Sequence, residues 1–294
     1  SGVANDTIIN SGGIQRLYTG GTTNDTIVNE NGQQFIAAGG EANSTIINEY
    51  GQQFVEEGGT ANDTVVNNYG QQFVGDGGIA NGTLVDYGGF QDVEGKANST
   101  TVRNGGNQHI GDSGIANDTT VTNYGNQYIG KGGIANDTTV SDYGEQTVSI
   151  HGTANDTIVN SRGHQSIDGI ANDAIINAGG SQNVAAGGIA NNTLVNADGL
   201  QRVFGTANDT ILDGGTQTLE GGIANNTIVN DGGRQIVDAG STANDTTVYT
   251  GGAIFIRENG TQLTGTTTLD GGSIYLTPVS NSGSSFFITS DIEN

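Results

Sequence analysis

The chain has 294 residues and an acidic, glycine-rich composition: 31 acidic against 8 basic residues give a formal net charge of -23, and 51 residues are glycine. A charge of this sign repels phosphate, which excludes nucleic acid as a favoured partner. The sequence has no cysteine, which excludes disulfides and thiolate chemistry, and its apolar runs are too short to span a bilayer.

One short phrase recurs from the first residues onward. Its anchor is the asparagine of "AN" or "TN", and the fourteen copies have nine spacings of 19 residues and four of 17. Each copy holds two β-type runs, such as "DTIVN" and "QQFVE", separated by a glycine-bearing turn. Because no apolar residues recur at helical spacing, the repeat predicts an all-β solenoid. The anchors are Asn5, Asn24, Asn43, Asn62, Asn81, Asn98, Asn117, Asn136, Asn155, Asn172, Asn191, Asn208, Asn225 and Asn244.

Several offsets from the anchor are nearly constant. Plus two is threonine in thirteen copies, with Ala174 as the exception, and plus four and plus twelve are aliphatic in every copy. Plus ten is glutamine in thirteen copies. Side chains alternate along a strand, so we expect these positions to face inward, with the glutamine amides bonded to one another along the stack. Every copy has glycine at plus eight, and we expect it to adopt a positive φ in a turn. These counts allow a slip of one residue in the copy anchored at Asn208, where the glycine is Gly215 and the glutamine is Gln217.

The length of one copy suits one coil of a parallel β-helix. At roughly 3.3 Å per residue, its contour of about 63 Å can form one triangular coil, and stacking at about 4.8 Å pairs each strand with its equivalents. We therefore expect about 14 to 15 coils built from 19-residue repeats. Residues 1–262 form the predicted repeat region of fourteen coils, and residues 263–294 form a degenerate coil and a C-terminal cap or junction.

The repeat resembles that of a known family. Copies of the type "GGxANDTxVNxGGxQxV", carried here by "SGVANDTIINSGGIQRL", "GGIANNTIVNDGGRQIV" and the copies between them, are similar to the passenger repeats of the AIDA-type self-associating autotransporter adhesins. The resemblance implies a right-handed β-helix secreted through an outer-membrane barrel and displayed on the surface of a Gram-negative bacterium. It also implies cell aggregation, biofilm formation and, in some members, adhesion to host cells or heptose on serine or threonine. Contact with the membrane is expected only through a translocator domain outside these residues.

An outward polar strip is the predicted contact surface. Aspartate occupies plus one in nine copies. This aspartate column indicates either a turn, in which the side chain bonds its own backbone, or an ion-binding site, and we favour the turn. Stacked carboxylates repel each other, so they belong in solvent, where an identical molecule can face them in an antiparallel, two-fold homotypic dimer. At plus three, threonine replaces an aliphatic residue in four copies, Thr247 among them. The predicted self-association residues are Asn5, Asp6, Asn24, Asp25, Asn62, Asp63, Asn98, Thr101, Asn117, Asp118, Thr120, Asn136, Asp137, Thr139, Asn155 and Asp156.

An aromatic patch is a second candidate surface. Phe35, Phe54 and Phe73 occupy plus eleven in three consecutive copies, near Tyr50 and Tyr69 at plus seven. Such a ladder either stabilises the strands or forms a contact surface for a host-cell glycan or protein.

Two other classes of function are less favoured. Polysaccharide-active enzymes also use parallel β-helices, but His109, His151 and His164 lie at unrelated offsets and the repeat is never interrupted by a unique carboxylate cluster. We therefore expect no enzyme activity and assign no catalytic, cofactor-binding or metal-binding residue. An ice-binding solenoid would need the plus-two threonines to point outward, against the predicted alternation.

Overall fold

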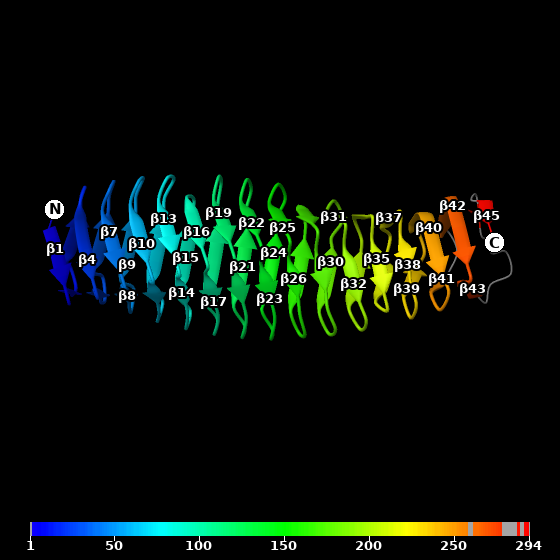
Figure 1. Cartoon of the computed structure of the whole chain (residues 1–294), viewed down its shortest axis with the longest axis horizontal. Coiled ribbons are helices and arrows are strands. Elements are labelled where there is room, and N and C mark those ends of the chain that lie inside the picture. The colour runs from blue at the N-terminus through cyan, green and yellow to red at the C-terminus, as the bar shows by residue number, and fades with distance from the viewer. Residues whose placement is uncertain (1, 258–260, 278–286, 289–290, 294) are drawn as a thin grey trace. The chain divides into compact units, whose positions relative to one another are not determined.

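The computed structural model describes residues 2–257, 261–277, 287–288 and 291–293, and residue contacts divide the chain into two units, residues 1–154 and 155–294. In the described residues, each unit consists of short β-strands joined by turns (Figure 1). These residues include no helix with the length and hydropathy that spanning a lipid bilayer requires.

The first unit contains eight coils of three strands each, numbered here from coil 1 (anchor Asn5) to coil 8 (anchor Asn136). The first strands end on the anchor: β1 (Gly2–Asn5), β4 (Gly21–Asn24), β7 (Glu41–Asn43), β10 (Thr60–Asn62), β13 (Ile79–Asn81), β16 (Lys96–Asn98), β19 (Ile115–Asn117) and β22 (Ile134–Asn136). The second strands hold plus three and plus four: β2 (Ile8–Ile9), β5 (Ile27–Val28), β8 (Ile46–Ile47), β11 (Val65–Val66), β14 (Leu84–Val85), β17 (Thr101–Val102), β20 (Thr120–Val121) and β23 (Thr139–Val140). The third strands hold plus nine to plus twelve: β3 (Ile14–Leu17), β6 (Gln33–Ile36), β9 (Gln52–Val55), β12 (Gln71–Val74), β15 (Phe90–Val93), β18 (Asn107–Ile110), β21 (Asn126–Ile129) and β24 (Glu145–Val148).

The second unit repeats this order, and β25 (Thr153–Asn155) spans its boundary. Its first strands are β28 (Ile170–Asn172), β31 (Ile189–Asn191), β34 (Thr206–Asn208) and β37 (Ile223–Asn225). Its second strands are β26 (Ile158–Val159), β29 (Ile175–Ile176), β32 (Leu194–Asn196), β35 (Ile211–Asp213) and β38 (Ile228–Val229). Its third strands are β27 (His164–Ile167), β30 (Ser181–Val184), β33 (Leu200–Val203), β36 (Thr216–Leu219), β39 (Arg234–Val237), β41 (Ala253–Arg257) and β43 (Ser273–Thr277).

The repeat changes near the end of the second unit. Here β40 (Thr242–Tyr249) and β42 (Gln262–Asp270) each replace a first and a second strand, and β42 pairs with β44 (Phe287–Ile288) and β45 (Asp291–Glu293). Together β42 and β43 form one further coil, in the region where the sequence predicts a degenerate one. Much of the expected cap lies outside the described residues, at 278–286, 289–290 and 294.

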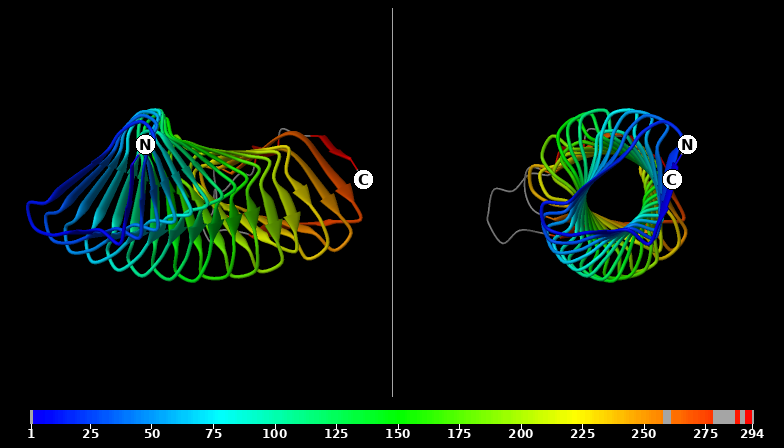
Figure 2. Two further views of the ribbon diagram at one scale, coloured as in Figure 1. Left: turned by 60° about the vertical axis from the view of Figure 1, so that its left-hand side comes forward. Right: turned by 90° about the vertical axis from the view of Figure 1, so that its left-hand side faces the viewer.

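Equivalent residues of successive copies stack in register. In the first unit, β9 and β12 pair in parallel, with Gln53 opposite Gln72 and Phe54 opposite Phe73. In the second unit, β28 and β31 pair in the same way. Figure 2 shows the coils of each unit lying side by side with their strands parallel. The predicted parallel β-solenoid, with one repeat to each coil, is confirmed.

The core consists of the positions that the sequence places inside. In coil 4 these are Thr64 at plus two, Val66 at plus four, Gln72 at plus ten and Val74 at plus twelve, and all four are buried. Alanine immediately before the anchor is buried as well, as at Ala61. Because the plus-two threonines point inward, the ice-binding hypothesis is wrong.

The buried glutamines satisfy one another. In the first unit, Gln72 Nε2 donates to Gln53 Oε1 at 2.7 Å, and Gln53 Nε2 donates to Gln34 Oε1 at 2.7 Å. The Thr64 hydroxyl also donates to Gln53 Oε1, at 3.2 Å. Each buried amide therefore replaces its hydrogen bonds to water with hydrogen bonds to the neighbouring glutamines and threonines. This keeps the free-energy cost of burying the amide low. The predicted glutamine ladder is confirmed.

The explanation expected for the plus-eight glycines is wrong. Gly51 and Gly89 do not have positive φ, whereas the preceding position does, as at Tyr50 (φ 63°). A Cβ on Gly51 would lie 2.6 Å from the Val28 carbonyl oxygen of the preceding coil, and on Gly89 it would lie 2.2 Å from the Val66 carbonyl oxygen. Glycine is needed here because neighbouring coils approach too closely for any side chain.

Candidate functional site

A left-handed corner follows every anchor asparagine. All fourteen plus-one residues have φ between 52° and 66°, a region in which glycine, asparagine and aspartate are least strained. This supports the turn explanation of the aspartate column. The corner also changes the side-chain alternation: Ala61 and Thr64 are both buried although they lie three residues apart. Plus one and plus three consequently face outward together on either side of a buried threonine.

The anchor asparagines form a hydrogen-bonded ladder. In the first unit, Asn24 Nδ2 donates to Asn5 Oδ1 at 2.8 Å, and Asn117 Nδ2 donates to Asn98 Oδ1 at 2.9 Å. Beyond coil 1 these side chains are half-buried. The sequence places them in the contact surface, but the structure uses much of their amide capacity inside the chain. At the corner, the exposed polar group is therefore the plus-one side chain, with the plus-three side chain beside it; we call this pair a rung.

The first four coils form a groove with an apolar floor. Its volume is about 390 Å³, and its rim is acidic. We call it the apolar groove, with rim residues Asp6, Asp25, Ser44 and Asp63 and floor residues Ile8, Ile27, Ile46 and Val65. Within the described residues, the three carboxylates make no hydrogen bond or ion pair. The groove therefore combines open negative charge with exposed aliphatic surface.

Coils 6 to 8 carry hydroxyl groups where the first coils carry aliphatic side chains. We call this surface the hydroxyl strip, with residues Ser99, Thr101, Asp118, Thr120, Asp137 and Thr139. The three threonines lie opposite one another in the paired strands β17, β20 and β23. Their hydroxyls have no partner within the described part of the chain. Coil 5 separates the two surfaces, because its plus-one residue is Gly82 and its plus-three residue is Leu84.

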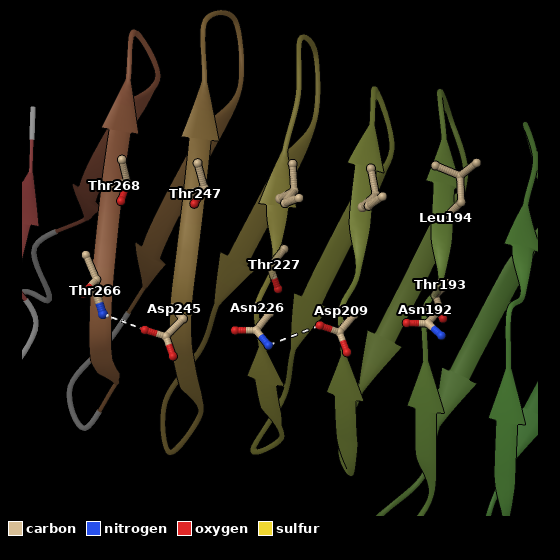
Figure 3. Close-up of a pocket in the computed structure, with 12 residues that line it drawn as sticks. Asn192, Thr193, Leu194, Asp209, Asn226, Thr227, Asp245, Thr247, Thr266 and Thr268 are labelled. Carbon is tan, nitrogen blue, oxygen red and sulfur yellow. Dashed lines mark hydrogen bonds between the residues drawn. The ribbon is translucent and has the colours of Figure 1, made fainter.

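The second unit contains an equivalent groove of about 490 Å³ (Figure 3). Its rim alternates asparagine with aspartate, and its side chains bond to each other: Asn226 Nδ2 donates to Asp209 Oδ1 at 3.2 Å. At the end of the row, the Thr266 backbone N–H donates to Asp245 Oδ1 at 2.8 Å. We call this the C-terminal groove, and its carboxylates, unlike those of the apolar groove, accept hydrogen bonds from donors of the chain itself.

The predicted aromatic patch is present in the first unit. The Phe35 and Phe54 rings stack with centroids 4.8 Å apart, and Phe54 and Phe73 follow at 5.1 Å. Tyr50 and Tyr69 stack at 5.9 Å and are exposed, whereas the phenylalanines are half-buried.

Sequence reasoning missed a second ladder beside these phenylalanines. Gln33 Nε2 donates to Gln52 Oε1 at 2.9 Å, and Gln52 Nε2 donates to Gln71 Oε1 at the same distance. The repeated "QQF" was a signal that could have found it. The outer face of β6, β9 and β12 therefore presents amides next to aromatic rings.

Two other clusters of polar side chains have partners within the chain. His109 Nδ1 lies 2.7 Å from Asp92 Oδ1, and its ring stacks on Tyr128 at 5.3 Å. Asp86, which sequence reasoning also missed, is buried and accepts hydrogen bonds from Arg103 and Asn104. No group of three histidine, cysteine, aspartate or glutamate side chains in the described residues could hold a metal ion.

Comparison with known proteins agrees with this architecture. A family described as the adhesin of the bacterial autotransporter system, a probable stalk, matches residues 1–51, 29–89, 47–106 and 213–272. A crystal structure of a TibA fragment hyper-glycosylated by TibC superposes with a TM-score of 0.81 at 32% identity, covering 98% of this chain and 100% of the fragment. The chain belongs to the AIDA family of autotransporter adhesins.

Membership of the AIDA family identifies this solenoid as an adhesin passenger of the autotransporter type, held at the cell surface and anchored in the outer membrane. No curated protein gave a significant match. An alginate lyase from a Paenibacillus strain aligns with a TM-score of 0.19 and 10% identity, which is too low to carry an argument. The enzyme alternative thus gains no support from these comparisons.

Proposed function

We propose that this adhesin passenger associates with identical copies on neighbouring Gram-negative cells and so promotes aggregation and biofilm formation. The observation that carries the proposal is the hydroxyl strip, where outward hydroxyls recur in three consecutive coils, with carboxylates beside them in two, and have no partner in the described chain. This refines the surface expected from the sequence, because the anchor asparagines now serve mainly to hold the strip in place.

Two copies can pair through the strip in an antiparallel, two-fold arrangement. A threonine hydroxyl of one copy then donates to an aspartate carboxylate of the other, and the two-fold axis repeats each bond. Both copies have the same coil spacing of about 4.8 Å, so the rungs remain in register along the contact. Coils 6 to 8 present both hydroxyl donors and carboxylate acceptors, whereas the apolar groove presents carboxylate acceptors with a single hydroxyl, that of Ser44.

The number of rungs compensates for the weakness of each one. A single hydrogen bond contributes about 0.5–1.5 kcal/mol, and many chains displayed on one cell act together. Each copy has a formal net charge of -23, so long-range repulsion opposes the contact. Salt screens that repulsion, and self-association is expected to strengthen as ionic strength rises from a low value.

Adhesion to a host-cell glycan or protein is a second candidate function. It rests on the outer face of β6, β9 and β12, where Phe35, Phe54 and Phe73 stack beside the half-buried outer glutamine ladder. Aromatic rings flanked by amides can pack against a sugar ring and also hydrogen-bond to it. Replacing the three phenylalanines with serine should abolish binding to host cells if this face is the contact.

A bead assay tests homotypic association. Beads of one colour carry the purified chain, and beads of a second colour carry either the chain or nothing. We expect mixed clumps only when both colours carry it. Clumps that form with blank beads would contradict the homotypic mechanism.

Variants of the strip then locate the contact. Thr101, Thr120 and Thr139 changed together to valine should weaken self-association at least about tenfold, because each lost hydroxyl removes a bond to a carboxylate from both sides of the pair. Valine already occupies this position at Val65, so the fold should tolerate it. The matched control is Thr147→Val on β24, which removes a hydroxyl from a different outward column and should leave association unchanged. Equal behaviour of the two variants would show that the strip is not the contact.

A further inference from the structure

The apolar groove has features that self-association does not use. Two copies meeting through it would bring like-charged rims together, and its floor of Ile8, Ile27, Ile46 and Val65 offers no hydrogen-bond donor. Ile8 is 61% exposed and Ile46 37% exposed, so this floor presents aliphatic surface to solvent in four consecutive coils. Exposed apolar surface of this kind with a polar rim is typical of a contact site.

The charge of the rim limits what the groove can accept. Asp6, Asp25 and Asp63 are exposed, and their carboxylates have no partner in the described part of the chain. The chain as a whole carries 31 acidic against 8 basic residues, which adds a long-range attraction for cations. A complementary ligand therefore presents an apolar stripe to the floor and positive charges to the rim.

The spacing of the coils favours a helical ligand. Floor residues recur about every 4.8 Å along the groove, and successive turns of an α-helix recur about every 5.4 Å. Across four coils, about three helical turns lie over the floor with a cumulative mismatch of less than about 2 Å. Apolar residues at i, i+4, i+7 and i+11 of such a helix can each contact a floor side chain, while lysines or arginines beside them reach the rim.

We propose that the apolar groove binds a cationic amphipathic α-helical peptide. The lysine or arginine side chains of the peptide pair with Asp6, Asp25 and Asp63, and its leucine-type stripe packs on the aliphatic floor. This gives the adhesin a heterotypic ligand at the opposite end of the first unit from the hydroxyl strip. The site is independent of the proposed self-association.

The test uses the full chain and a synthetic peptide of about 14 residues made of leucine and lysine with one tryptophan, arranged to give a single apolar stripe when helical. Binding is followed by tryptophan fluorescence and by the gain of helical circular dichroism. A peptide of the same composition in scrambled order controls for charge, and a peptide with glutamine in place of lysine controls for apolar contact. We expect the striped cationic peptide to bind at least about tenfold more tightly than either control.

The chain itself provides well-tolerated variants for the same test. Floor residues changed to threonine (Ile8→Thr, Ile27→Thr, Ile46→Thr and Val65→Thr) copy the side chain present at Thr120 in the same ladder. Rim residues changed to asparagine (Asp6→Asn, Asp25→Asn and Asp63→Asn) copy the left-handed Asn226. Each set should weaken peptide binding at least about tenfold, the first by removing apolar contact and the second by removing charge.

The outcomes separate this proposal from self-association. The floor variant should lose the peptide and keep bead clumping, whereas the hydroxyl-strip valine variant should lose clumping and keep the peptide. Equal binding of the scrambled peptide, or unchanged binding to the floor variant, would overturn the proposal. Loss of clumping in the floor variant together with no peptide binding would also overturn it, and would assign the groove to contact between copies.

Discussion

Coils 1 to 4 and coils 6 to 8 of the first unit share one backbone and differ in the chemistry of their plus-three column. Both have the left-handed corner at plus one, the asparagine ladder and the buried threonine at plus two. At plus three, however, the first coils carry Ile8, Ile27, Ile46 and Val65, and the later ones carry Thr101, Thr120 and Thr139. The inward residues are held constant by packing, whereas the outward column is free to differ, so one scaffold can hold two surfaces of different chemistry.

The rim of the C-terminal groove in the second unit differs from that of the apolar groove in its hydrogen bonding. Its rim aspartate Asp209 accepts a hydrogen bond from Asn226, and Asp173 accepts one from Asn192 at 3.1 Å. No such donor neighbours the carboxylates of the apolar groove among the described residues. Substituting asparagine for aspartate at a corner thus changes both the net charge and the availability of the neighbouring carboxylate.

The largest effect is expected from breaking the scaffold that the two surfaces share. Gly89→Ala in coil 5 places a Cβ 2.2 Å from the Val66 carbonyl oxygen, so the coils must separate, and we expect the free energy of unfolding to fall by about 3 kcal/mol or more. Urea unfolding followed by circular dichroism measures this. Gly75→Ala is the control, because its Cβ would make only an ordinary contact at 3.6 Å and Ala37 occupies the same offset. Similar losses in both variants would refute the close-approach explanation.

A graft should convert one surface into the other. Thr101→Ile, Thr120→Ile and Thr139→Ile, combined with Ser99→Asp, give coils 6 to 8 the floor and rim of the apolar groove. We expect calorimetry to show a second binding site for the striped cationic peptide, and bead clumping to weaken about tenfold because the hydroxyl donors are lost. A variant that gains no second site would mean that plus-three chemistry alone does not define the groove.

Salt should act on the two surfaces in opposite directions, with a smaller effect than the substitutions. Between about 0.01 M and 0.15 M, the Debye length falls from about 30 Å to about 8 Å. Peptide binding at the apolar groove depends on attraction and should weaken several-fold, whereas self-association depends on relief of repulsion and should strengthen. Measuring peptide binding and bead clumping over the same series of salt concentrations checks this. A change in the same direction in both would contradict the electrostatic distinction between the two surfaces.

Much of the fold follows from the sequence because its period is short and its pattern strict. The alternation of Thr64 with Val66 and of Gln72 with Val74 predicts one buried face, and stacking of identical copies then follows from the repeat length. The stacked phenylalanines were predictable for the same reason. The role of the plus-eight glycines was not, because the contact that requires glycine is made with the preceding coil and not within the turn.

The surface that we propose for self-association was only partly predictable. The exposed column of aspartates and the threonines at plus three could be read from the repeat. The half-burial of Asn24 and its equivalents could not, because a regular strand would place plus zero on the inward face with plus two, whereas the left-handed residue between them turns the anchor partly outward.

The solenoid, its inward residues and the column in which its outward chemistry varies could be predicted from the sequence, because each of these depends on local periodicity. Which outward side chains remain without a partner depends instead on how the coils stack. Stacking brings each residue against its equivalents one coil away. Hydrogen bonds along the ladder therefore use the amides of the anchor asparagines, and neighbouring aliphatic side chains form the floor of a groove. A corner carboxylate accepts a hydrogen bond only where the next coil supplies a donor.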